Sequence, residues 1–307
     1  MILGEAVPRL PIKGDGYRPA MAPNHPARRL HHRLETIHAV TYFAEESRQA
    51  AKDIGLKGFW MGYFGFRAAP LGPVGAGVVE AVFANFAPRR VRKAVPDAWA
   101  HASPEACTEA RRTSAVAALE RVAAEELSAV APAVVGRLEG VVETADHLGR
   151  PLFAANRDLG FPTEPAGRLW QLATDLREHR GDGHVATQAA AGLDPVEMHL
   201  IYALGSGFPG EVLRQSRDWT DEEWADGVDR LVVRGLLVDA TTVTDEGRAL
   251  HEHIESTTDE LALRSLVGGL GSVEAIEDLA ADLTPLARAV SSSGILPFPN
   301  PIGLPED

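Results

Sequence analysis

Three polar side chains near the start of the chain have the types and the spacing to do chemistry. Glu35, His38 and Tyr42 are separated by three and four residues, which places them on one face of a helix. A histidine can donate or accept a hydrogen bond or ligate a metal, and a His–Tyr pair leaves acid–base chemistry open. We expect His38 and Tyr42 to be the polar anchors of a site.

The segment that follows, residues 58–72, is rich in aromatic residues and glycine although the whole chain is only 6% aromatic. Glycine permits close approach of the backbone, and the rings supply broad apolar walls. Arg67 in this segment can pair with a carboxylate or a phosphate. We predict a pocket for a planar or acidic small molecule. Its walls would be Phe59, Trp60, Tyr63, Phe64 and Phe66. The alternative is that the rings are core and that backbone carbonyls satisfy the polar groups.

Residues 177–184 gather two histidines, two arginines and two carboxylates at a predicted helix end. Cations in a last turn complement the helix dipole, which is a sufficient structural reason for most of them. His179 and His184 are five residues apart, which does not fit a helical pair of metal ligands, so we predict no metal site. Glycines beside Arg177 and His184 favour an anion, or the polar end of a ligand, at these two residues.

The distribution of charge argues against a general affinity for polyanions. The net charge is −13, and residues 1–100 are basic (+6) whereas residues 181–307 are strongly acidic (−16). Nucleic acid and anionic lipid would therefore be attracted weakly. The basic cluster is Arg89, Arg90, Arg92 and Lys93. Such a cluster is usually a solvated helix face, but it is the candidate patch if nucleic acid is bound at all.

Helical periodicity covers most of the chain. We predict helices over residues 28–52, 75–86, 88–93, 169–179 and, with an interruption near Pro132, 104–147. Residues 149–165 read as a linker-like bend. The chain is thus mainly α-helical.

The most specific pattern lies in the C-terminal third. Asp194-Pro195 begins a helix, residues 209–217 form a second one, and Thr220-Asp-Glu-Glu223 is a capping box that opens a third. A two-strand hairpin over residues 235–244 and a long helix from Asp245 follow. Three helices, a hairpin and a closing helix are the winged-helix order.

Three stretches of this region carry a family resemblance. They are Leu231-Val-Val-Arg-Gly-Leu-Leu, Val243-Thr-Asp-Glu-Gly-Arg-Ala-Leu250 and His253-Ile-Glu255. They resemble the MarR-type winged-helix superfamily at the end of the recognition helix, the wing and the following helix. The element order extends the resemblance over about residues 169–290. The chain also looks like an actinobacterial branch of generic helix-turn-helix proteins, from which no catalytic residue is carried over.

The helix that would enter the major groove of DNA has the wrong charge. Such helices present Arg, Lys, Asn or Gln to base edges. Residues 220–234 hold five carboxylates and only Arg230 and Arg234, and the wing tip has no basic residue. DNA binding is therefore possible but disfavoured, and the alternative is a scaffold retained for packing or dimerisation.

We divide the chain into five parts: an irregular Pro-rich arm (1–27), a helical ligand-pocket domain (28–150), a linker (151–168), a winged-helix-like domain with a short hairpin wing (169–293) and a Pro-rich tail (294–307). Similar spacings after Gly55-Leu56 and Gly192-Leu193 suggest an internal pseudo-repeat of two winged-helix-like halves. The alternative is chance similarity. The single cysteine, Cys107, excludes an internal disulfide. No secretory or membrane-spanning segment is recognisable, so we expect a cytoplasmic protein.

These observations favour a winged-helix-related, regulator-like protein that binds a small molecule, with a homodimer as its assembly. The cofactor is unknown, and no membrane partner is expected. The alternative is a metabolic enzyme or carrier on the same scaffold, using acid–base chemistry at His38 and Tyr42, or haem or metal at His38, His179 or His184. No recognised catalytic motif decides between them.

Overall fold

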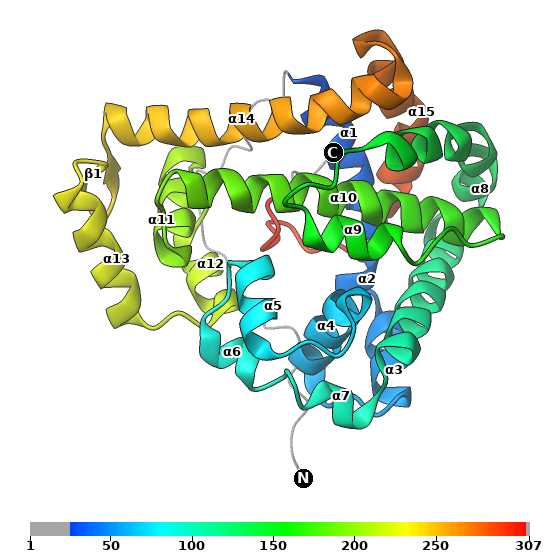
Figure 1. The fold of residues 1–307 in the computed structure, drawn as a ribbon, viewed down its shortest axis with the longest axis horizontal. Coiled ribbons are helices and arrows are strands. Elements are labelled where there is room, and N and C mark those ends of the chain that lie inside the picture. The colour runs from blue at the N-terminus through cyan, green and yellow to red at the C-terminus, as the bar shows by residue number, and fades with distance from the viewer. Residues whose placement is uncertain (1–24, 305–307) are drawn as a thin grey trace.

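The computed structural model describes residues 25–304 and shows a mainly helical protein with a small two-stranded antiparallel sheet (Figure 1). In chain order the elements are α1 (Pro26–His38), α2 (Val40–Phe43), α3 (Glu45–Asp53), α4 (Gly58–Ala68), the 3-10 turn η1 (Ala69–Leu71), α5 (Ala76–Phe83), α6 (Pro88–Arg92), α7 (Ala98–His101), α8 (Pro104–Thr144), α9 (Pro151–Arg157), α10 (Pro165–Ala190), α11 (Pro195–Ser206), α12 (Gly210–Arg217), α13 (Asp221–Val233), β1 (Leu237–Asp239), β2 (Thr242–Val243), α14 (Asp245–Leu270) and α15 (Val273–Ser292).

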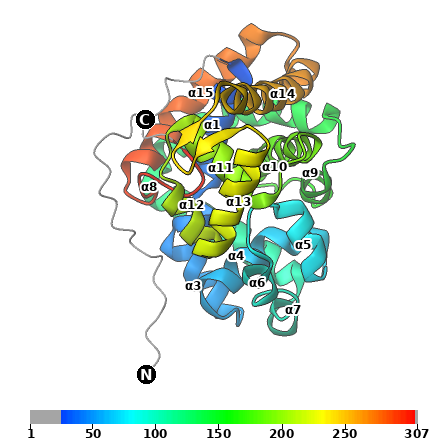
Figure 2. The same ribbon diagram turned by 90° about the vertical axis from the view of Figure 1, so that its left-hand side faces the viewer.

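The largest apolar core is formed where α8 and α10 pack against α1, α14 and α15 (Figures 1 and 2). At the crossing of α8 and α14, Gly269 lies so close to Val141 that a Cβ atom would come within 2.5 Å of its backbone. This core takes residues from Ala27 to Leu304 and thus from both halves of the chain. The domain boundaries proposed from the sequence stay a prediction.

The predicted first helix is wrong as a single element. It is divided into α1, α2 and α3 by breaks at Ala39 and Ala44, and the extended backbone of Ala44 (ψ 146°) redirects the chain. The redirection lets α3 pack against α8. Helix α2, held between the two breaks, carries Tyr42 toward the aromatic segment, which itself is helical (α4).

Three further expectations are corrected. Helix α8 is kinked at Ala123 (φ −150°, ψ 35°), whereas Pro132 lies within helical backbone. The expected bend over residues 149–165 contains α9, which begins with Pro151 at its first position. Helix α10 continues through the glycines at 181 and 183 to Ala190, so its end is not at His179. The backbone amides near His184 therefore lie within a helix, and an anion at Arg177 and His184 stays a prediction.

The C-terminal unit runs α11, α12, α13, the β1–β2 hairpin and α14, on the left of Figure 1. The capping box is confirmed: the Thr220 hydroxyl accepts from the Glu223 amide, and the Glu223 carboxylate accepts from the Thr220 amide. A second capping box, Asp194 with Glu197, opens α11. The interpretation of this unit as a winged helix and the internal repeat both stay predictions.

Candidate functional site

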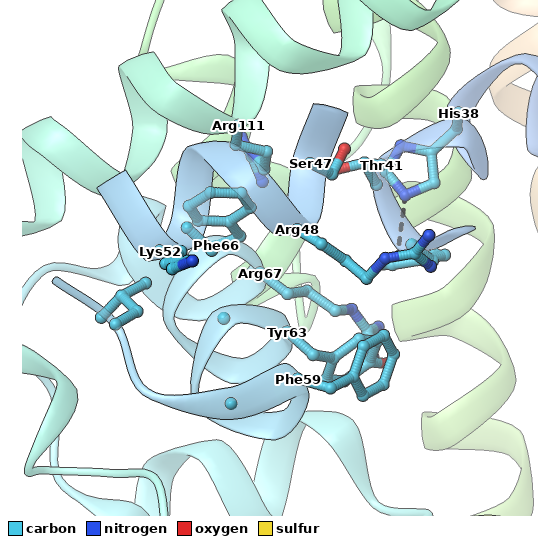
Figure 3. A pocket seen from close by; sticks show the side chains of 15 residues that line it. His38, Thr41, Ser47, Arg48, Lys52, Phe59, Tyr63, Phe66, Arg67 and Arg111 are labelled. Carbon is cyan, nitrogen blue, oxygen red and sulfur yellow. Dashed lines mark hydrogen bonds between the residues drawn. The ribbon is translucent and has the colours of Figure 1, made fainter. Parts of the chain in front are cut away.

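A cavity of about 200 Å³ lies between the α2–α3 turn and α4, against the N-terminal half of α8 (Figure 3). Side chains from five helices, α1, α2, α3, α4 and α8, meet in it because α2 and α3 are separated by a break at Ala44. The lining residues used below are His38, Thr41, Tyr42, Arg48, Lys52, Phe59, Tyr63, Phe66, Arg67 and Arg111. Phe59 and Tyr63 stack with their ring centroids 6.3 Å apart and form one wall.

A hydrogen-bonded chain of three side chains fixes one side of the cavity. The Thr174 hydroxyl donates to the carbonyl of Trp170 (2.8 Å), so its oxygen accepts from His38 Nδ1 (2.9 Å). His38 Nε2 then accepts from the Tyr42 hydroxyl (2.9 Å). The imidazole also stacks on the Trp170 ring at 5.8 Å. Burial and the positive charge of Arg177 lower the pKa of His38 well below its usual value, and burial raises the pKa of Tyr42. Both groups are neutral at pH 7.

A buried ion network joins α4 to α10 and α1 behind the cavity. Arg67 donates two 3.0 Å hydrogen bonds to Glu178, from Nε and Nη2. Arg177 donates to Glu178 (2.8 Å) and to Glu35 (2.9 Å). Desolvation alone would raise the pKa of Glu178, but the two arginines hold it well below its usual range. Arg67 also lies 4.1 Å above the Phe83 ring. Glu178 therefore already neutralises Arg67.

Arg111, from α8, is a buried cation of a different kind. Its side chain is almost inaccessible (2% exposed), and it donates to Asn156 Oδ1 at 3.0 Å and lies over the Trp170 ring. Its Nε atom is buried without a hydrogen-bond partner, and it makes no ion pair with a residue of the described chain. The nearby buried Asp175 compensates it poorly, because desolvation raises the pKa of that carboxyl to about 7. Arg111 thus offers an unused donor and an incompletely balanced charge.

The mouth of the cavity carries two more cations. Arg48 and Lys52 on α3 are exposed, and Arg48 donates to the Phe43 carbonyl. The charged side chains among the lining residues are all cationic. Thr41 adds a buried hydroxyl without a hydrogen-bond partner. The arrangement can bind an anionic group, with aromatic surface beside it.

The structure brings together four of the eight predicted ligand-binding residues. His38, Tyr42, Tyr63 and Arg67 line the cavity, whereas Trp60 lines a separate, larger one. The other three lie elsewhere, and they are Phe64 in an aromatic core, Arg177 behind the cavity beside Glu178, and His184 near Thr258 and Glu255 on α14.

The sequence did not indicate Arg48, Lys52 and Arg111 as site residues. Arg111 belongs to an ordinary amphipathic pattern on α8, and only tertiary packing takes it to this cavity. The spacing of Arg48 and Lys52, four residues apart, is a local signal for one helix face. Once α3 is known to be a separate helix, that signal places both at the mouth.

The predicted basic cluster is engaged in ion pairs. Arg89 pairs with Glu223 and Asp218, Arg90 with Asp218, and Arg92 with Glu80. Arg89 also spans from α6 to the capping box of α13. Most of its charge is therefore compensated within the protein, which weakens the case for a nucleic-acid patch.

Two features are absent from residues 25–304. No group of three or more His, Cys, Asp or Glu side chains in this part of the chain is placed to hold a metal ion. Within the same residues, every helix is too short or too polar to cross a bilayer.

Comparison with known proteins gives the family. A helix-turn-helix family model matches residues 27–297, which is most of the chain. Neither a curated protein nor a solved structure matches. The match covers far more than half of the chain, and the chain therefore belongs to this helix-turn-helix family.

Proposed function

We propose that the protein is a regulator-like member of its helix-turn-helix family that binds a small, planar, anionic molecule in the cavity between α2, α3, α4 and α8. The observation that carries the proposal is Arg111, a buried guanidinium with an unused donor in a cavity whose other charged groups are also cationic. An uncompensated buried charge is costly, and a bound anion would supply the missing partner.

The ligand class follows from the walls and the size. Tyr42, Phe59, Tyr63 and Phe66 offer flat aromatic surface, and a volume of about 200 Å³ suits one substituted ring rather than a nucleotide. Thr41 and Tyr42 supply hydroxyls that can complete the hydrogen bonding of a carboxylate. An aromatic monocarboxylate of the size of benzoate fits this description.

The DNA-reading function of the C-terminal unit is weak or lost in this proposal. The unit retains the order of a MarR-like winged helix, and α13 would be its recognition helix. The two cations of α13 are used internally: Arg230 pairs with Asp194 and Glu197, and Arg234 pairs with Glu197. Asp221 pairs with Arg214 of α12, whereas Glu222 and Asp226 have no ion pair among the described residues. The carboxylates of α13 would therefore repel phosphates. A homodimer is part of the proposal, and light scattering in solution tests it.

An enzyme or carrier built around His38 and Tyr42 is the alternative. The hydrogen bond between the two side chains, on the cavity wall, favours it. General acid–base catalysis is most effective when the pKa of the catalytic group is close to the working pH. Burial moves the pKa of both groups away from pH 7, in the directions that keep each neutral. The pair is therefore better suited to hydrogen-bonding a ligand than to moving a proton.

Isothermal titration with benzoate tests the proposal. We expect saturable binding by the wild type and a loss of about tenfold or more in affinity for Arg111→Met, since a hydrogen bond to a charged group contributes about 1.5–3 kcal/mol. Arg112→Met is the matched control: Arg112 is the next residue of α8, but it pairs with Glu109 and Glu164 outside the cavity. Equal affinity in all three proteins, or no binding by the wild type, contradicts the proposal.

A further inference from the structure

A second cavity, of about 1,090 Å³, lies on the other side of the aromatic wall. We call it the outer chamber. Helices α2, α3 and α4 form one side of it, α12 forms another, and the C-terminal segment after α15 closes a third. Its lining residues include Arg121, Val212, Arg217, Ile295, Phe298 and Ile302. Figure 2 shows the C-terminal segment, in red, running near α12 and α8.

The C-terminal segment is a built wall of this chamber. Asn300 is fully buried, donates to the Leu304 carbonyl (3.1 Å) and accepts from the Leu304 amide (3.0 Å), which closes a loop. Leu296 and Leu304 are buried in the main core. Arg217, the last residue of α12, donates to the Pro301 carbonyl at 2.8 Å. These contacts hold residues 296–304 against α12 and leave the chamber open between them.

Arg217 is, like Arg111, a buried cation without a carboxylate partner among the described residues. It is 8% exposed and lies 4.6 Å from the Phe86 ring centroid. Its Nε atom is buried without a hydrogen-bond partner, and the described residues offer it no ion pair. Arg121, which lines the same chamber, is instead half-exposed and pairs with Glu46. Of the other two arginines that line the chamber, Arg90 pairs with Asp218, and Arg48 is exposed and donates to the Phe43 carbonyl. Arg217 is thus the buried arginine of the chamber that lacks an ion pair among the described residues.

The rest of the chamber is mostly apolar. Aromatic rings come from α2 and α4, Val212 comes from α12, and Ile295, Phe298 and Ile302 come from the C-terminal segment. A volume near the upper end of the range of small-molecule sites would accommodate a molecule of several rings or a long acyl chain. Buried cation and apolar walls together select an amphiphile that ends in an anionic group.

We propose that the outer chamber is a binding site for an apolar, multi-ring or acyl molecule bearing a single anionic group, with the Arg217 guanidinium as the anchor for that group. This site is distinct from the cavity at Arg111 and does not depend on it, although Tyr42, Arg48, Phe59 and Tyr63 line both. Its occupant contacts α12, the second helix of the C-terminal unit, and the C-terminal segment at once. Occupancy therefore stabilises the packing of the helix-turn-helix unit on the aromatic segment.

Two fluorescent probes of nearly the same shape test the site. One is 8-anilinonaphthalene-1-sulfonate, which carries a sulfonate, and the other is N-phenyl-1-naphthylamine, which is uncharged. We expect the folded wild type to bind both saturably. Arg217→Met is expected to lower the affinity for the sulfonate probe by about tenfold or more, because the charge-assisted hydrogen bonds are lost. The affinity for the neutral probe is expected to change by less than about twofold. Arg217→Lys retains the charge and recovers part of the affinity.

Controls separate this proposal from the other one. Arg121→Met changes a chamber arginine that is already paired, and Arg111→Met changes the inner cavity, so neither is expected to alter the affinity for the sulfonate probe by more than about twofold. Near-ultraviolet circular dichroism checks that each variant is folded. If the wild type binds neither probe, or if Arg217→Met weakens both probes equally or neither, the assignment is overturned. If benzoate does not bind but the sulfonate probe still does, only the proposal for the inner cavity is contradicted.

Discussion

Arginine–carboxylate pairs occur both around the inner cavity and in the C-terminal helix-turn-helix unit, but they are buried in the first region and exposed in the second. Beside the cavity, the Arg67 and Glu178 side chains are 9% and 1% exposed. In the C-terminal unit, Arg230 and Asp194 pair with side chains 45% and 39% exposed. Water and salt screen the second pair and not the first. Burial rather than composition thus decides where charge has a large effect.

The two regions also differ in the sign of the charge that is left over. Around the inner cavity, cations exceed ionised carboxylates, because Arg111 is unpaired and the pKa of Asp175 is raised to about 7. On α13, carboxylates exceed cations, and the arginines are used to pair with α11. The net charge of the whole chain, −13, does not show that the two regions differ in the sign of their charge. A buried basic site therefore coexists with an acidic surface.

The largest expected effect is the loss of stability when the buried carboxylate of Glu178 is removed. Glu178→Gln keeps the shape of the side chain but leaves Arg67 without an ionic partner, and breaking a buried pair costs about 3–5 kcal/mol. Urea denaturation at pH 7 measures the free energy of unfolding. Arg230→Gln, in the exposed pair, is the control and is expected to cost less than about 1 kcal/mol. Similar losses in the two variants would show that burial does not distinguish the two regions.

The second prediction concerns pH. Because burial raises the pKa of Asp175 to about 7 in the folded protein, above its value of 3.8 in the unfolded chain, this group lowers stability as pH rises from about 4 to 7, by up to about 1.4 kcal/mol per pH unit. Asp175→Asn cannot ionise. The advantage of the variant over the wild type should therefore be larger at pH 8 than at pH 5, by about 2–3 kcal/mol. Thermal or urea unfolding at the two pH values measures this. An advantage that does not change with pH would contradict the raised pKa.

A smaller effect is expected at the start of α13. Thr220→Ala removes the hydroxyl that accepts from the Glu223 amide, at a cost of about 1 kcal/mol. Hydrogen–deuterium exchange should then be faster by about fivefold in the amides of α13 while α10 is unchanged. Thr113→Ala, an exposed threonine within α8, is the control variant. Unchanged exchange in α13 would mean that the capping box does not hold the unit.

The smallest effect concerns DNA. Fluorescence anisotropy with a random-sequence duplex at low salt should show no binding by the wild type above background, because α13 repels phosphates. Replacing Asp221, Glu222 and Asp226 with lysine should create salt-sensitive binding if the unit can dock as a winged helix. Salt-dependent binding by the wild type would contradict the proposed loss of DNA binding.

Local signals predicted the elements that depend on local interactions. The Thr220–Glu223 capping box, the order of helices after Asp194 and the i, i+4 proximity of His38 and Tyr42 are all present. The sequence also indicated that residues 58–72 build an aromatic wall, although it did not tell Phe59, in the wall, from Phe64, in the core.

Features that depend on distant residues could not be predicted. Arg67 was expected to bind the ligand, but Glu178, 111 residues away, already neutralises it. Arg111 and Arg217 gained their unbalanced charge only when α8 and α12 were packed against other helices. No Gly or Pro marks the break at Ala44 in the sequence. The break is associated with the packing of α3 on α8, which is a tertiary contact.

The most direct test of the central claim compares benzoate with benzamide, which has the same shape and no charge, by isothermal titration against the wild type and Arg111→Met. We expect the wild type to prefer benzoate by about tenfold or more, and Arg111→Met to abolish this preference. Equal affinity of the wild type for the two compounds, or a preference for benzoate that survives the loss of Arg111, would contradict a buried cationic site for an anionic ligand.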